Sequence, residues 1–171
     1  MFLSIKEMEV RKICFDTSFA PGELDLEGEE VRQSVPIRAE GTAQLLGNTG
    51  GEVRIEGGLE GALEADCDRC LGRVVFPLRE RFDLFYRPME LGLGEELAID
   101  EGEAEMGFYE GLGLELADVI NEQVLLALPM QRVCRPDCKG ICPVCGVNRN
   151  ETECRCAARP VDDRWAALKK W

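Results

Sequence analysis

Cysteines dominate the stretch between residues 134 and 156, which reads CRPDCKGICPVCGVNRNETECRC. Six of the nine cysteines lie in this stretch, which has too few apolar residues to build a hydrophobic core. With one upstream pair they make four close pairs, and only Cys14 is left over. Four thiolates complete the tetrahedral shell of a zinc ion, so four pairs can serve two ions. The pairs are Cys67/Cys70, Cys134/Cys138, Cys142/Cys145 and Cys154/Cys156.

The local sequence of each pair can direct two sulfurs at one ion. Pro143 presets the backbone after Cys142, and Gly146 lets the chain fold back, which is typical of a zinc knuckle. Cys154 and Cys156 lie two residues apart, so in an extended chain both side chains point the same way. Pro136 makes the third pair a turn rather than a helical pair.

The assignment of pairs to ions has two possible forms. We favour one compact, zinc-ribbon-like site and a second site that ties an upstream hairpin to the tail. An interleaved arrangement within 134–156, with Cys67 and Cys70 left as free thiols, is the alternative. The favoured sites are Cys142, Cys145, Cys154 and Cys156, and separately Cys67, Cys70, Cys134 and Cys138.

Other roles for the cysteines compete with structural zinc. Disulfides are uncommon in the cytosol, and the N-terminal residues do not resemble a secretory signal. A redox pair at Cys67/Cys70 would lack the helix N-terminus that lowers a thiol pKa. An iron–sulfur cluster uses the same ligands. Because catalytic zinc needs an open coordination position, we expect two structural zinc ions, with Cys14 a small buried hydrophobe.

Charge and composition divide the chain into an acidic body, 1–130, and a cysteine-rich tail, 131–171. The net charge is −13, yet residues 130–171 carry 9 Lys and Arg against 5 Asp and Glu. The body should repel polyphosphate, so any RNA contact falls to the tail, and a basic protein is the expected partner of the body. The simpler interpretation is that the acidity only keeps the protein soluble.

Several functional classes are excluded or disfavoured by composition. The chain has no histidine, which excludes Ser-His-Asp triads, Cys-His dyads and histidine metal ligands. The chain contains no run of 18 apolar residues, the length that a membrane-spanning helix needs. We therefore expect a cytoplasmic protein without a membrane partner. Phe108-Tyr109 and Trp165/Trp171 could stack on bases, but packing is the commoner role of such residues.

The periodicity of apolar residues predicts an α+β fold. Alternation over three successive stretches predicts an antiparallel sheet with one buried face, and a stripe at helical spacing predicts a helix that covers it. The first 20 residues could add a strand, residues 88–112 are expected to form a loop, and Asp162 could begin a short terminal helix. The strands are expected near 37–45, 53–63 and 74–86, and the helix over 114–128.

The tail resembles the YceD family, which is associated with accumulation of large-subunit ribosomal RNA. The resemblance lies in Cys134-Arg-Pro-Asp-Cys138-Lys-Gly-Ile-Cys142-Pro-Val-Cys145-Gly-Val-Asn148-Arg-Asn150, then Cys154-Arg-Cys156 and Asp162-Asp-Arg164-Trp-Ala-Ala-Leu168. The upstream Cys67-Asp-Arg-Cys70-Leu71 also matches that family's internal pair, whereas Arg149 stands where a leucine is commoner. The resemblance implies bacterial or organellar ancestry and a role in the synthesis, processing or stability of 23S ribosomal RNA. It also implies a functional link to a small ribosomal protein of the large subunit.

From residues and resemblance together, we expect a non-enzymatic ribosome-assembly factor without a small-molecule substrate. The partner would be a large-subunit ribosomal protein or precursor particle, with ribosomal RNA contacted through the tail. Two alternatives remain open. One is a thiol-redox or metal-handling protein using Cys67/Cys70, and the other is a zinc-ribbon adaptor.

Overall fold

The computed structural model describes residues 1–26, 30–47, 49–89 and 106–156, and its secondary structure is mostly β-strand. The expected terminal helix from Asp162 lies outside these residues, as do Trp165 and Trp171. The elements in chain order are β1 (Phe2–Ser4), α1 (Ile5–Met8), β2 (Ile13–Phe19), β3 (Val31–Gln33), β4 (Ile37–Leu45), β5 (Val53–Asp66), β6 (Arg73–Pro88), β7 (Met106–Tyr109), β8 (Gly113–Glu115) and α2 (Leu116–Leu126).

The chain forms two compact units. The first comprises Met1–Glu64 and Val75–Pro129, and the second comprises Ala65–Val74 and the described part of Met130–Trp171. The turn between β5 and β6 therefore belongs to the cysteine-rich unit. How the tail packs on the body stays a prediction.

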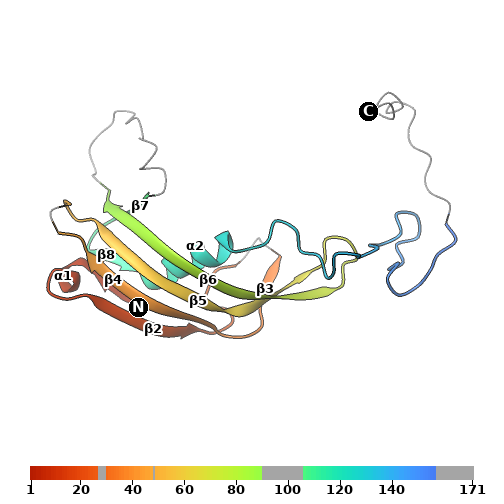
Figure 1. Cartoon of the computed structure of the whole chain (residues 1–171), viewed down its shortest axis with the longest axis horizontal. Coiled ribbons are helices and arrows are strands. Elements are labelled where there is room, and N and C mark those ends of the chain that lie inside the picture. The colour runs from red at the N-terminus through yellow and green to blue at the C-terminus, as the bar shows by residue number, and fades with distance from the viewer. Residues whose placement is uncertain (27–29, 48, 90–105, 157–171) are drawn as a thin grey trace, which may run out of the picture. The chain divides into compact units, whose positions relative to one another are not determined.

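A six-stranded sheet builds most of the first unit. Its main path runs β2-β4-β5-β6-β7, and β3 pairs with β5 off this path (Figure 1). The three long strands lie where alternation predicted them, because every second side chain enters the core. β2 and β4 are antiparallel, as are β4 and β5, whereas the edge strand β7 runs parallel to β6.

Two glycines lie opposite each other on neighbouring strands of the sheet, at positions where a larger side chain would not fit. Gly41 of β4 lies opposite Gly57 of β5, and Phe15 of β2 lies opposite Gly41 on the other side. A Cβ on Gly41 would lie 2.7 Å from the Phe15 ring, and one on Gly57 would lie 2.8 Å from the Phe82 ring. Two phenylalanine rings thus occupy the space that side chains at these glycines would need.

The buried side chains of α2 belong to the same core as those of the strands. Leu116, Val119, Ile120 and Val124 are at most 3% exposed and join buried residues of β2, β4, β5 and β6 in one cluster. The prediction of an α+β fold is confirmed in part, since the unit is mainly sheet with few helices.

Three sequence predictions need correction. Residues 88–112 were expected to form a loop, but Met106–Tyr109 form β7, whereas 90–105 lie outside the described residues. The helix expected over 114–128 begins only at Leu116, because Gly113–Glu115 form β8, which pairs with β1. Cys14 was expected to be buried, yet it is exposed. Its neighbours Ile13 and Phe15 are buried, so strand alternation turns Cys14 to the opposite face.

Candidate metal centres

Eight cysteines gather into two clusters, both within the second unit. In each cluster all four Sγ atoms lie within 4.8 Å of one another. The structure brings together the sets favoured from sequence, and the interleaved arrangement is not the one found. No disulfide joins any of the nine cysteines. The first centre contains Cys67, Cys70, Cys134 and Cys138, and the second contains Cys142, Cys145, Cys154 and Cys156.

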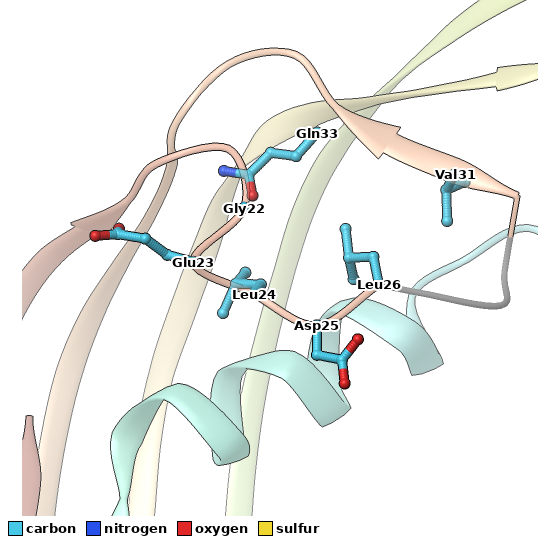
Figure 2. Close-up of a pocket in the computed structure, with 7 residues that line it drawn as sticks. All are labelled: Gly22, Glu23, Leu24, Asp25, Leu26, Val31 and Gln33. Carbon is cyan, nitrogen blue, oxygen red and sulfur yellow. The ribbon is translucent and has the colours of Figure 1, made fainter.

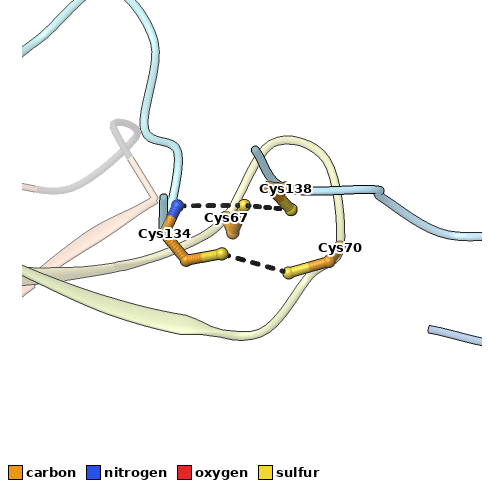
Figure 3. A group of neighbouring side chains, drawn as sticks. All are labelled: Cys67, Cys70, Cys134 and Cys138. Carbon is orange, nitrogen blue, oxygen red and sulfur yellow. Dashed lines mark hydrogen bonds between the residues drawn. The ribbon is translucent and has the colours of Figure 1, made fainter. Parts of the chain in front are cut away.

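The spacing of the sulfurs in the first centre fits a four-coordinate metal (Figure 3). The Sγ atoms of Cys67 and Cys138 are 3.9 Å apart, and those of Cys70 and Cys134 are 3.7 Å apart. A tetrahedron with metal–sulfur bonds of about 2.3 Å has sulfur–sulfur edges of about 3.8 Å. Four thiolates at this spacing would complete the coordination shell of a bound ion and would leave no open position on it.

The two Cys-x-x-Cys turns share one backbone design. The N–H of Leu71 donates to the carbonyl of Cys67 at 2.9 Å, and the N–H of Gly146 donates to that of Cys142 at 2.8 Å. Both residues have positive φ, 58° at Leu71 and 74° at Gly146. The sequence signalled the second turn through its glycine, whereas the first uses a leucine in a conformation that disfavours it.

Replacing Leu71 with Gly should leave the first centre intact. Leucine at positive φ costs about 1–2 kcal/mol, and glycine recovers most of this despite its greater freedom when unfolded. Leu71 is 63% exposed, so little packing is lost. We expect unchanged metal stoichiometry and equal or greater thermal stability, measured by metal analysis and thermal unfolding. Lower stability would mean that the exposed leucine packs more closely than its exposure indicates.

Backbone contacts attach the hairpin tip to the start of the tail. The carboxylate of Asp68 accepts from the N–H of Arg132 at 2.7 Å, and the N–H of Asp68 donates to the carbonyl of Arg132 at 2.9 Å. The carbonyl of Arg69 accepts from the N–H of Ile141 at 2.8 Å. A Cβ on Gly140 would lie 2.9 Å from that same carbonyl oxygen, so glycine permits the close approach. Sequence reasoning missed these contacts because they join segments far apart in the chain.

Hydrogen bonds make two of the thiols unusually acidic. Burial raises the pKa of Cys67, but N–H groups of Cys134, Cys70 and Arg69 outweigh it and lower the pKa to about 6. Backbone N–H groups of Cys145 and Val144 lower the pKa of Cys142 to about 6. Each centre therefore holds one thiolate that can bind a metal ion at neutral pH without first losing a proton.

One other thiol in each centre strongly resists ionisation. Burial and the neighbouring Cys138 raise the pKa of Cys134 to about 12, and Cys145 is the main cause of the rise of Cys156 to about 12. Four negative sulfurs at this spacing repel one another strongly. A divalent cation would remove that repulsion, so the donor set fits a thiolate-preferring metal ion.

The side chain of Asn150 forms hydrogen bonds with the part of the tail that holds Cys138, a ligand of the first centre. Its Nδ2 donates to the sulfur of Cys138 at 3.3 Å, and its Oδ1 accepts from the N–H of Lys139 at 2.9 Å. The Asn150 N–H donates to Oδ1 of Asn148 at 3.0 Å. Asn150 thus orients a ligand from outside the shell, and the hydrogen bond lowers the pKa of Cys138. Sequence analysis placed it only within a family pattern.

Asn150→Ala should weaken metal binding at the first centre by about tenfold, because ligand-orienting partners typically contribute this much. The measurement is competition with a chromophoric chelator. Thr152→Ala is the matched control, since Thr152 is exposed, lies two residues further along the chain and donates its N–H to the carbonyl of Asn148 at 3.0 Å. Equal affinities for the two variants would contradict the role of Asn150.

A separate pocket of about 520 Å³ lies in the first unit beside β3 (Figure 2). Leu24, Leu26 and Val31 line it, and Nε2 of Gln33 donates to the carbonyl of Phe19 at 2.6 Å. Among the described residues that line it, Glu23 and Asp25 are the ones that can titrate.

Comparison with known proteins places these features in a family. An uncharacterized protein of Mycobacterium tuberculosis, Rv2926c, is 32% identical over 163 residues, covering 90% of this chain and 70% of the relative. A chloroplastic large ribosomal RNA subunit accumulation protein YCED homolog 1 of Zea mays is 26% identical, covering 85% and 56%. No solved structure matches the chain. The profile of the large ribosomal RNA subunit accumulation protein YceD matches residues 55–170, which includes both centres, and the chain therefore belongs to the YceD family.

Proposed function

We propose that this protein is a non-enzymatic assembly factor of the large ribosomal subunit that supports 23S ribosomal RNA synthesis, processing or stability. The observation that carries the proposal is the family match over residues 55–170, which spans both tetrathiolate centres. A closed shell of four sulfurs fits a scaffold better than a catalyst. Along the described residues, no helix is both long and apolar enough to cross a membrane.

We propose structural zinc as the metal at both centres. Zinc favours four thiolates in a tetrahedron, and the sulfur spacing of the first centre agrees with its bond length. The ion would fix the fold of a unit that has little apolar core of its own. Metal analysis of the purified protein tests this assignment, and iron with visible charge-transfer absorption would contradict it.

The two units differ in the partner chemistry that they favour. In the second unit Lys139, Arg149 and Arg155 are exposed, and they supply positive charge for precursor RNA or an acidic protein surface. The Lys- and Arg-free segment 88–131 carries 11 acids, which favour a basic ribosomal protein. We therefore propose that the tail and the body contact different components of one precursor particle.

The test is deletion of the gene in the native host, with quantification of 23S against 16S ribosomal RNA. We expect 23S to fall selectively and to recover with the wild-type gene. The tagged protein should recover immature large-subunit RNA or its ribosomal proteins, and this recovery should fall as salt rises. Normal 23S levels together with no recovery of ribosomal components would refute the proposal.

Thiol titration separates this function from thiol-redox chemistry. A structural metal protects its ligands, so native thiols should react slowly and faster after chelation. Cys14 is the exception, since it is exposed and outside both centres. Fast reaction of Cys67 or Cys70 without metal release would instead favour a redox protein.

A further inference from the structure

A groove of about 380 Å³ lies between the β7–β8 region and α2 in the first unit. Its walls combine aromatic rings with carboxylates, and we call it the acidic aromatic groove. Sequence analysis did not predict it, because its residues come from distant parts of the chain. The residues that matter here are Phe2, Tyr86, Phe108, Glu110, Asp118 and Glu122.

Two aromatic rings of the groove are exposed to solvent, and a third is buried. Phe2 is 47% exposed and Phe108 is 56% exposed, so both rings are available to a partner. Tyr86 is buried, and its ring lies over Gly107, where a Cβ would come within 2.5 Å of Cε1. The hydroxyl of Tyr86 donates to Glu122 at 3.5 Å, which holds that carboxylate at the groove wall.

The groove acids differ from the acids on the exposed face of the sheet. On the sheet, acids pair with arginines, as in Arg38–Asp16 at 2.8 Å, and Arg54–Asp83 and Arg79–Glu60 at 2.7 Å. Within the described residues, no Lys or Arg pairs with Glu110, Asp118 or Glu122, and residues 88–131 contain none. A fourth groove carboxylate, Glu115, lies 3.7 Å from the N-terminal ammonium of Met1. The groove therefore keeps the negative charge of the other three carboxylates, whereas arginines neutralise the paired acids of the sheet face.

We infer that the acidic aromatic groove binds a linear Lys- and Arg-rich protein segment that carries an apolar side chain. Cations would pair with Glu110 and Asp118 and lie over the faces of Phe2 and Phe108. The apolar side chain would cover the exposed rings. A nucleic acid is disfavoured because its phosphates would meet uncompensated carboxylates. The inference deepens the proposed function by assigning the surface, and it rests on that proposal only for the partner's identity.

The test uses the full chain and a short fluorescein-labelled peptide of Arg and Leu, with binding followed by fluorescence anisotropy. Two double variants remove equal charge. E110Q/D118N changes the groove, and E9Q/E80Q changes exposed acids that do not line it. We expect E110Q/D118N to bind at least about threefold more weakly than E9Q/E80Q, with a shallower salt dependence, because two ion pairs are lost.

Further measurements separate the groove from general charge attraction. Phe108→Ala should weaken binding at low and high salt alike, since apolar contact is not screened. Equal binding by the two double variants, equal binding of a Glu-for-Arg peptide, or displacement of the peptide by single-stranded RNA would overturn the inference. Circular dichroism checks that each variant is folded. Because the 23S measurement does not depend on this peptide, the groove and the assembly role can fail separately.

Discussion

Removing metal with a strong chelator should unfold the second unit and leave the first unit folded. The buried cluster of the second unit consists of Cys67, Cys70 and Cys138, with Val133 packed against it. Under the proposed assignment, metal binding would therefore supply most of its folding free energy, which for structural zinc sites is about 10–16 kcal/mol. The first unit has its own apolar core of strand and helix residues. Amide hydrogen exchange should show lost protection in 130–156 and retained protection in β4, in β5 up to Glu64 and in β6 from Val75 onward.

The second centre should release its metal first. Only Cys142 of that centre is buried, whereas Cys134 is the one exposed ligand of the first. A slow titration with chelator should accordingly release two ions in two steps. Lowering the pH should favour release at both centres, because protons compete for the thiolates. Simultaneous release would mean that the two centres form one cooperative folding unit.

Cysteine variants provide the matched control for metal removal. Cys67→Ser and Cys142→Ser should each reduce the bound metal by one ion, because three thiolates and a hydroxyl hold zinc poorly. Cys14→Ser should retain both ions, since Cys14 is exposed on β2 and belongs to neither centre. Full amide protection of 130–156 after chelation would contradict a metal-dependent fold.

The parts of the fold that sequence predicted are those specified by local pattern. Alternation located β4, β5 and β6, and close cysteine spacing favoured the two four-cysteine sets that the structure brings together, while leaving an interleaved arrangement open. β7 and β8 were missed because each is short and depends on distant partners, Phe85 opposite Met106 and Phe2 opposite Glu115. Burial of Cys14 was predicted from its residue type and was wrong, whereas the alternation of buried and exposed residues along β2 places it on the exposed face.

Parts of the candidate sites follow from three-dimensional contacts that no local pattern encodes. Asn150 reaches the sulfur of Cys138 only after the chain has turned at Gly140. The acidic aromatic groove likewise needs Phe2 and Phe108, which lie near opposite ends of the first unit's sequence. Charge analysis did point to the right segment, because 88–131 contains no Lys or Arg to pair with Glu110, Asp118 or Glu122.

Ile120→Ala should destabilise the first unit by about 2–5 kcal/mol, the usual cost of truncating a fully buried isoleucine. Ile120 is 0% exposed and lies in the cluster that joins α2 to the strands. Small domains have only about 5–15 kcal/mol of stability, so the loss is a large fraction of the total. We expect Tm to fall by about 10 °C, measured by calorimetry on the metal-loaded protein.

Leu126→Ala is the matched control, because it makes a similar truncation on the same helix at a side chain that is 72% exposed. Its effect should stay within about 0.5 kcal/mol, as for most surface substitutions. Metal content should be unchanged in both variants, since all eight clustered cysteines lie in the other unit. Similar losses for Ile120→Ala and Leu126→Ala would mean that helix propensity, rather than packing of α2 into the shared core, determines stability here. A large difference would establish that α2 is held by its buried face, which is also what keeps Asp118 and Glu122 in place along the groove.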